Sequence, residues 1–284
     1  MQQSKAMTII ELLIVAAILA LLLAVAVPGL GQSQNEKRLT ECTKNLRRLG
    51  QANYIYAQDD PGTFPCIGGQ RKQNDGAMVI FDPKNREKQP SSDGIPSPTV
   101  DLWALLREEY NAKEFHLQPK DFICPVTKDV PDPAQDPSAY HDFLSAENLS
   151  YAFQFQHDPN RRVLGTSSEP TFPLMADANP YIKGGVKKDF AEDRLSKYRG
   201  NSKNHGKARP GQNVLFQDGH VTFEKSPDCG LSGKADPDVD GARGRDNCYT
   251  VHSREGKGYV DPGSAAPTAT QCNLGSKSDA CLVP

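Results

Sequence analysis

The stretch MTIIELLIVAAILALLLAVAVPGL, residues 7–30, decides the fold that the sequence predicts. Of its 24 residues, 20 are apolar, and the 16 residues from Leu12 to Val27 carry no polar side chain. About 20 apolar residues are enough for a helix to span a bilayer. The stretch therefore predicts a membrane-spanning helix over residues 7–30.

Three explanations compete for an apolar run that follows a single basic residue, Lys5. A secretory signal peptide would be cut after Ala24-Val25-Ala26. A simple membrane anchor would need only the apolar length. Neither explains Glu11, one turn into the run, because an ionised carboxylate in hydrocarbon costs several kcal/mol and therefore needs a partner. The third explanation is an apolar helical segment in which the Glu11 carboxylate has a partner that compensates its charge.

The short leader and the apolar run together resemble the N-terminal segment of type IV prepilins and type II secretion pseudopilins. The resemblance implies that a prepilin peptidase cuts between Ala6 and Met7 and methylates the new N-terminus. Glu11 is then the fifth residue after the cut, and Pro28 is the helix kink. The family usually has glycine before the cut, where this chain has Ala6. In filaments of the family the acid faces the N-terminal amine of a neighbouring subunit, so Glu11 is expected to set the register of assembly.

The helix is expected to continue through residues 31–60 as an amphipathic segment. Apolar residues follow one another at intervals of three or four, which is typical of a helix with one buried face. They are Leu39, Cys42, Leu46, Leu49, Ala52 and Tyr56. The sequence Asp59-Asp60-Pro61-Gly62 then ends the helix, because proline and glycine interrupt helical hydrogen bonding. This pattern predicts a helix from Thr8 to about Gln58.

Residues 61–225 are expected to form a small α+β domain. A short helix is predicted from Asp101 to Tyr110, and strands are predicted at Leu149–Phe155 and Pro173–Asp177. The clearest signal is NVLFQDGHVTFE, residues 213–224, in which two β-rich runs flank Asp-Gly and predict a tight hairpin. The fold class that we expect is α+β and type IV pilin-like. In it, the long membrane-spanning N-terminal helix packs on a small antiparallel sheet, and a disulfide-rich C-terminal loop region over 226–284 follows.

Several motifs resemble a narrower group of pseudopilin-like proteins that is abundant in planctomycetes. They occur in order along residues 1–224 as CTKNLRRLGQANYIYAQDDPGTFP, FICP, SYAF, MADANP and NHGKARPGQNVLFQDGHV. The group has a histidine before an Asp-Gly pair, and the matching residues are His205, Asp218 and Gly219. The group usually has nine residues between histidine and aspartate, and this chain has twelve. His205, Asp218 and His220 are candidate metal ligands or acid–base groups, and the alternative is a loop and a turn that these residues shape.

Composition argues against several function classes. The 33 basic and 35 acidic residues give a net charge of −2, so bulk charge does not favour nucleic acid as a partner. The sequence contains no G-x-S-x-G, H-E-x-x-H or P-loop motif. We therefore expect no enzymatic activity.

Seven cysteines, four of them in the last 56 residues, indicate disulfides in an exported domain. No C-x-x-C pair supplies the spacing of a zinc or thioredoxin site. The local pairing in the tail is Cys229–Cys248 and Cys272–Cys281, and four cysteines allow three connectivities. Cys42, Cys66 and Cys124 leave one thiol over that the sequence does not identify.

The tail also contains DPDVDGARGRD, residues 236–246. Asp236, Asp238 and Asp240 alternate before a glycine, as in the first half of a calcium-binding loop, and Asp246 lies near its end. Major pseudopilins of type II secretion bind calcium in their C-terminal loops, and the resemblance implies the same here. The loop is therefore a candidate Ca²⁺ site, and the alternative is a solvated acidic turn.

These observations predict a structural subunit, a pilin or pseudopilin, of a type IV pilus or a type II secretion pseudopilus. After the leader of residues 1–6 is removed, it would assemble through its N-terminal helix. Its expected partners are prepilin peptidase, other pilin or pseudopilin subunits, and the inner-membrane machinery of secretion or the pilus. We expect a single-pass inner-membrane protein whose globular domain lies in the periplasm or, within a filament, on the cell surface. The alternative is a minor pilin-like module, anchored in the membrane, whose loops bind a ligand, a secreted substrate or DNA.

Overall fold

The computed structural model describes the chain in segments. They are residues 8–59, 62–68, 86–87, 98–107, 115–157, 163–180, 182–183, 186–187, 200–206, 209–230, 248–249, 251–252, 259–260 and 282–283. Within residues 23–35 it describes the backbone only.

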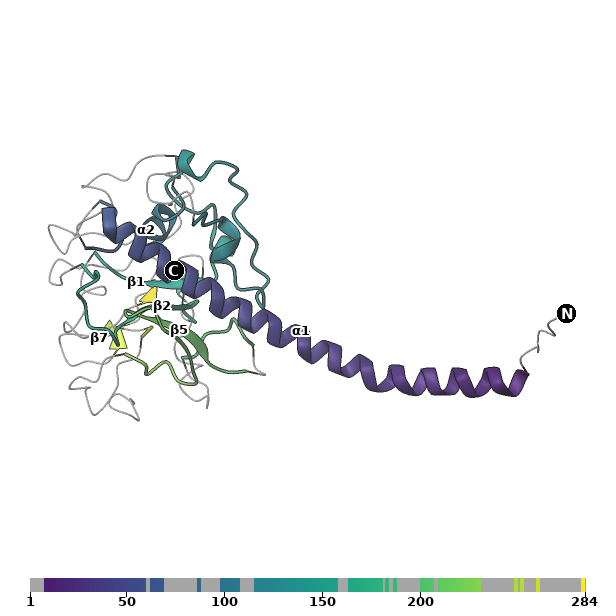
Figure 1. Cartoon of the computed structure of the whole chain (residues 1–284). Helices are drawn as coiled ribbons and strands as arrows, with labels where there is room; N and C mark the ends of the chain where they lie inside the picture. The colour runs from purple at the N-terminus through teal and green to yellow at the C-terminus, as the bar shows by residue number, and fades with distance from the viewer. Residues whose placement is uncertain are drawn as a thin grey trace.

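One long helix, α1 (Ile9–Asp59), dominates the molecule. Its 51 residues correspond to a length of about 76 Å at 1.5 Å per residue. The first turn is capped reciprocally: the Thr8 amide donates to the Glu11 carboxylate at 2.8 Å, and the Glu11 amide donates to the Thr8 hydroxyl at 3.4 Å. The helical backbone continues through Pro28 and ends one residue beyond the predicted Gln58. Figure 1 shows its first half leaving the globular part as a separate rod.

The predicted membrane-spanning character of residues 7–30 is wrong. In the part of the chain that the structure describes, no helix combines the length and the apolarity needed to cross a membrane. The expected single-pass inner-membrane location is corrected by the same finding, and so is the membrane-spanning part of the expected fold class.

The globular part is built on a five-stranded antiparallel sheet in the order β6-β5-β2-β1-β9. Its strands are β1 (Tyr151–Gln154), β2 (Pro173–Asp177), β5 (Gln212–Phe216), β6 (Val221–Glu224) and β9 (Leu282–Val283). Two further pairs lie apart from it: β3 (Ile182–Lys183) with β4 (Val186–Lys187), and β7 (Val251–His252) with β8 (Tyr259–Val260). The short helices are α2 (Pro98–Ala104), η1 (Pro119–Phe122), η2 (Pro137–Ala139) and η3 (Ala146–Asn148).

The second half of α1 packs on this sheet along the predicted stripe. Cys42, Leu46, Leu49, Ala52 and Tyr56 are all buried, and α1 contacts β5, β2, β6 and η1. The side chains of β1, β2 and β5 are buried along their whole length, because α1 lies along the sheet and α2 also packs against β1. The amphipathic stripe was therefore predicted correctly as core packing, except that its first residue, Leu39, is only half-buried.

The strand predictions also hold. β1 lies inside the predicted Leu149–Phe155, β2 coincides with Pro173–Asp177, and β5 and β6 form the predicted hairpin. The short helix predicted from Asp101 instead lies earlier, at Pro98–Ala104. The end of the chain also differs from the expected loop tail, because β9 pairs with β1 at the sheet edge and the Leu282 side chain is buried.

Candidate metal centre

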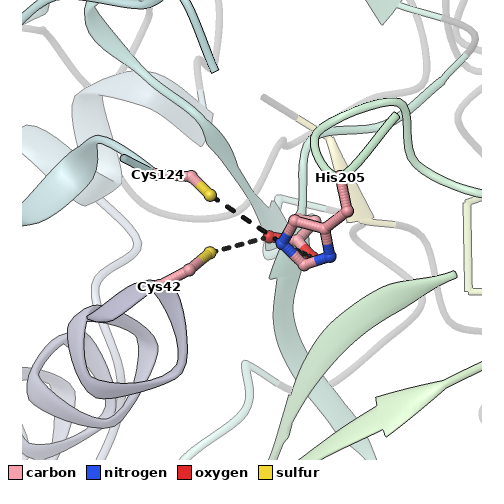
Figure 2. A group of neighbouring side chains, drawn as sticks. Cys42, Cys124 and His205 are labelled. Carbon is pink, nitrogen blue, oxygen red and sulfur yellow. Dashed lines mark hydrogen bonds and ion pairs between the residues drawn. The ribbon is translucent and has the colours of Figure 1, made fainter. Parts of the chain in front are cut away.

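Four side chains that can bind a metal meet between α1 and the sheet. Cys42 comes from the buried face of α1, Cys124 lies two residues after η1, Asp177 ends β2, and His205 lies in the turn before β5. One ligand atom from each lies within 4.8 Å of those of the other three, and all four residues are buried. Figure 2 shows the two thiols on one side of this group and the His205 ring on the other.

Three distances describe the group. Cys42 Sγ lies 3.4 Å from Asp177 Oδ1, Cys124 Sγ lies 3.8 Å from His205 Nε2, and His205 Nε2 lies 3.5 Å from Asp177 Oδ2. Ordinary N–H···O hydrogen bonds measure 2.7–3.2 Å, and the imidazole–carboxylate distance exceeds this range. The four groups thus converge on one point without closing the imidazole–carboxylate pair into a normal hydrogen bond.

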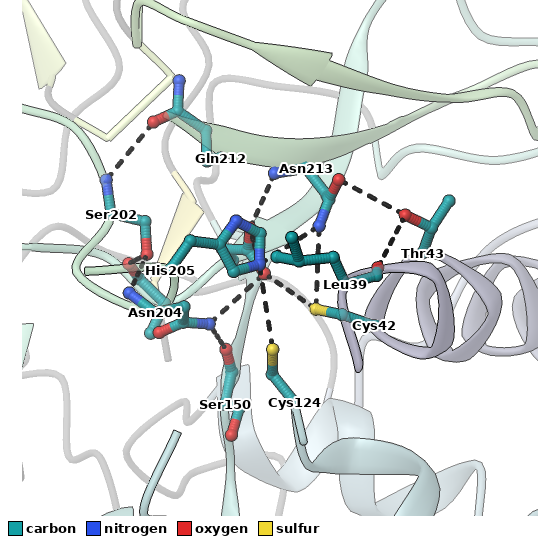
Figure 3. Close-up of polar contacts among 12 residues, drawn as sticks. Leu39, Cys42, Thr43, Cys124, Ser150, Ser202, Asn204, His205, Gln212 and Asn213 are labelled. Carbon is teal, nitrogen blue, oxygen red and sulfur yellow. Dashed lines mark hydrogen bonds and ion pairs between the residues drawn. The ribbon is translucent and has the colours of Figure 1, made fainter. Parts of the chain in front are cut away.

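A shell of donors surrounds the cluster (Figure 3). The Tyr151 hydroxyl and the Asn213 side-chain amide donate to Cys42 Sγ, at 3.4 and 3.6 Å. The Asn213 backbone amide donates to Asp177 Oδ2 at 2.6 Å, and the Asn204 side-chain amide donates to Oδ1 at 3.3 Å. These donors favour the negative forms of the thiol and the carboxyl group, which are the forms that bind metals.

The His205 ring is held in place by an aromatic contact. It stacks on Phe223 with ring centroids 5.8 Å apart, and the Arg209 guanidinium lies 4.2 Å from the Phe223 centroid. Nε2 faces the cluster, and Nδ1 is buried without a hydrogen-bond partner among the described residues. The stacking fixes the direction in which the imidazole presents Nε2.

Burial and neighbouring charge make the cluster costly without a cation. Burial raises the pKa of the Asp177 carboxyl, although His205 and the Asn213 amide act in the opposite direction. Burial, a hydrogen bond with Cys124 and the charge of Asp177 raise the pKa of Cys42. The hydrogen bond with Cys42 lowers the pKa of Cys124 to about 7, with a further contribution from His205 and against the effect of burial. For His205, burial lowers the pKa, but Cys124 and Asp177 outweigh it and the net shift is upward.

A second group, Cys66, His157 and Asp101, forms a hydrogen-bonded chain elsewhere. Cys66 Sγ lies 3.6 Å from His157 Nδ1, and His157 Nε2 lies 2.8 Å from Asp101 Oδ2. The Ile67 amide donates to the other Asp101 oxygen at 2.7 Å. Burial lowers the pKa of His157, but the Asp101 charge and hydrogen bond raise it well above its usual value. The chain has the order thiol, imidazole and carboxylate, as in activated thiol nucleophiles.

The structure divides the candidate set His205, Asp218 and His220. His205 joins the buried cluster, whereas Asp218 and His220 lie in the β5–β6 turn and bond to each other. Gly219, with φ of 87°, provides the left-handed conformation that this turn needs. The sequence therefore pointed to one residue of the buried cluster and grouped it with two residues that lie elsewhere.

The other predicted site residues divide into described and undescribed positions. Glu11 is exposed, and the backbone and hydroxyl hydrogen bonds from Thr8 lower its pKa. Cys229 and Cys248 are buried, and both of their amides donate to the Pro227 carbonyl. Cys229 is a free thiol in the structure. The disulfide expected between Cys229 and Cys248 stays a prediction. Outside the described residues lie Ala6, Met7, Asp236, Asp238, Asp240, Asp246, Cys272 and Cys281, and with them the calcium loop and the second disulfide.

Sequence reasoning missed Cys42, Cys124 and Asp177 as one site. Cys42 was assigned to the core stripe, Cys124 to a short buried segment, and Asp177 to the end of a strand. The available signal was that the chain places a cysteine or an acid at a predicted buried position in three separate segments. Comparison with known proteins adds nothing to this picture, since no family model, curated protein or solved structure matches the chain.

Proposed function

We propose that the chain is a structural subunit, a pilin or pseudopilin, that assembles into a filament through the first half of α1. The observation that carries this proposal is the exposed apolar surface of residues 9–22. Ten large apolar side chains there are between 46% and 81% exposed. They are Ile9, Ile10, Leu12, Leu13, Ile14, Val15, Ile18, Leu19, Leu21 and Leu22.

This surface covers every side of the helix, which an amphipathic helix does not do. A helix that is apolar all round is stable in water only when other structure covers it. The second half of α1 is covered by its own sheet, but the first half leaves the globular part (Figure 1). The same segment of further copies is the covering surface that we propose, because a rod that is uniformly apolar is complementary to itself.

Glu11 supplies the polar element of this packing. Its carboxylate accepts two hydrogen bonds from Thr8, one from the backbone amide and one from the hydroxyl at 2.9 Å. When the helix is covered by other copies, the acid loses water and needs a cation. We propose that prepilin peptidase cuts between Ala6 and Met7, and that the new amine of a neighbouring subunit provides that cation.

The structure gives Glu11 a second role, as a helix cap, and two variants separate the roles. Glu11→Gln keeps the capping geometry and removes the charge, because glutamine also serves in a capping box. Thr8→Val keeps the charge and removes the hydroxyl of the cap. We expect Glu11→Gln to be processed but to enter filaments poorly, and Thr8→Val to assemble almost normally. Both variants are compared with wild type by sedimentation of filaments sheared from cells.

Mass spectrometry of the mature N-terminus tests the processing step. The proposal expects a chain that begins at methylated Met7. Filament incorporation of Glu11→Gln at the wild-type level would contradict the role of the charge. A wild-type chain that is processed but stays monomeric would contradict the proposed function and would favour the binding module.

A further inference from the structure

We propose that Cys42, Cys124, Asp177 and His205 bind one Zn²⁺ in a closed site that fastens α1 to the sheet. The inference goes beyond filament assembly, because the site lies in the globular half of α1 and does not involve residues 9–22. It holds or fails independently of that proposal.

The first support is the agreement between the distances and tetrahedral coordination. Zinc binds thiolate sulfur at about 2.3 Å, and imidazole nitrogen and carboxylate oxygen at about 2.0–2.2 Å. A regular tetrahedron with these bonds has edges of about 3.3–3.8 Å between ligand atoms. The distance of 3.4 Å from Cys42 Sγ to Asp177 Oδ1 and the distance of 3.8 Å from Cys124 Sγ to His205 Nε2 lie in this interval, and together they include one atom of each ligand. The distance of 3.5 Å joins His205 Nε2 to the other carboxylate oxygen, Oδ2. The imidazole–carboxylate distance is too long for a good hydrogen bond, and the two distances that include Cys42 and Cys124 are right for edges of a zinc site whose four ligand atoms lie within 4.8 Å of one another.

The second support is the kind of ligand. Two thiolates, an imidazole and a carboxylate are donors that zinc accepts, whereas calcium and magnesium take oxygen ligands almost exclusively. These four ligands therefore favour a transition metal that accepts both sulfur and nitrogen, rather than the Ca²⁺ expected in the tail. Zinc is the commonest such ion in sites that hold four protein ligands.

The third support is the charge of the buried cluster. Two thiolates and one carboxylate carry three negative charges, and Zn²⁺ reduces this sum to one. The donors on Tyr151, Asn204 and Asn213 already point at Cys42 and Asp177 and stabilise the remaining charge. Such outer contacts are the usual surroundings of metal ligands.

The site would be structural rather than catalytic. Four protein ligands fill the tetrahedron, and burial of all four leaves no position for water or substrate. The ligands come from α1, the segment after η1, the end of β2 and the turn before β5. The metal would therefore tie the helix that emerges from the domain to three separate parts of that domain.

The direct experiment is metal analysis of the purified full-length chain by inductively coupled plasma mass spectrometry. We expect one zinc per chain. Replacement by Co²⁺ should give the absorption of tetrahedral cobalt with thiolate-to-cobalt charge transfer. Cys42→Ser, Cys124→Ser and His205→Gln should each lower zinc affinity more than 100-fold, which exceeds the 10–100-fold effect of altered outer contacts. Cys229→Ser, which removes a buried thiol outside the cluster, should keep the zinc.

A variant that fails to fold does not affect the test, because the wild type gives an independent measurement. With zinc bound, Cys42 and Cys124 should resist alkylation under native conditions, and a chelator should expose both. A wild-type chain that contains no zinc would overturn the proposal. A metal-free chain with a Cys42–Cys124 disulfide found by mass mapping would overturn it in favour of a covalent link. Full zinc content in Cys42→Ser and Cys124→Ser would place the metal elsewhere and would also overturn it.

Discussion

The approach of α1 to the sheet at Gly50 allows a test in which two effects of opposite sign compete. Gly50 is buried in α1, and a Cβ added there would lie 3.0 Å from both Cδ atoms of Leu215 on β5. Gly50→Ala gains about 1 kcal/mol of helix propensity. Carbon atoms pack best at about 3.5–4.0 Å, so the new methyl must displace the buried Leu215 side chain. Overpacking of this kind costs about 1–3 kcal/mol.

The net expectation is a loss of about 1 kcal/mol in the free energy of unfolding. Equilibrium unfolding in urea measures it, and with a slope of about 2 kcal/mol per molar the midpoint should fall by about 0.5 M. Leu215→Val, which shortens the opposing side chain, serves as the matched control. In that background Gly50→Ala should cost less or should stabilise the protein, with a coupling energy of at least about 0.5 kcal/mol.

The opposite result is equally specific. If Gly50→Ala stabilises the protein by the full value of about 1 kcal/mol, and by the same amount in the Leu215→Val background, α1 does not approach β5 this closely. The placement of Cys42 would then also be doubtful, because it lies two turns earlier on the same face of α1.

Three further expectations follow from other contacts. Gly165→Ala should destabilise the protein by about 3 kcal/mol or more in urea unfolding, because its Cβ would lie 1.9 Å from a backbone carbonyl oxygen. In the control Gly219→Ala the new Cβ meets open space, so the cost should be only about 1–2 kcal/mol, from the left-handed backbone conformation. The raised pKa of His157 means that its stabilisation is complete below its unfolded pKa of about 6.5 and is lost as pH rises through the folded pKa. The urea midpoint should therefore fall as pH rises above about 6.5, and less steeply in a double variant, His157→Gln with Asp101→Asn. Cys66 is half-buried while the other four described cysteines are buried, so iodoacetamide should label it first under native conditions, and faster labelling of another of the five would contradict this arrangement.

Local pattern was enough to predict much of the fold. The spacing of Leu46 and Leu49 identified the buried face of α1, and the Asp-Gly pair at residues 218–219 placed the β5–β6 hairpin. Both signals come from a few consecutive residues, in which side-chain direction follows directly from helical or strand geometry. The two residues of β9 carry no such signal, because their pairing with β1 depends on contacts across more than a hundred positions of the chain.

The apolar run at the N-terminus shows a different limit. Composition predicts that residues 7–30 avoid water, but it does not say what covers them. Membrane lipid and copies of the same helix satisfy the same apolar pattern, and the prediction included both. The structure contradicts the membrane-spanning part and shows large apolar side chains exposed along residues 9–22, so covering by copies of the same helix stays the proposal, which the variants of Glu11 and Thr8 test.

The metal centre was hardest to predict because no two of its ligands are close in sequence. A search for paired cysteines fails when each of four segments supplies one ligand. His205 was identified but was grouped with Asp218. His205 contacts Asn213, near the start of β5, whereas Asp218 follows the end of the same strand. The register of the sheet brings Asp177 beside Asn213 instead, and the buried stripe of α1 then places Cys42 against Asp177. The site is thus a consequence of the packing of α1 on the sheet, so a change at Gly50 that shifts the helix should weaken metal binding as well as stability.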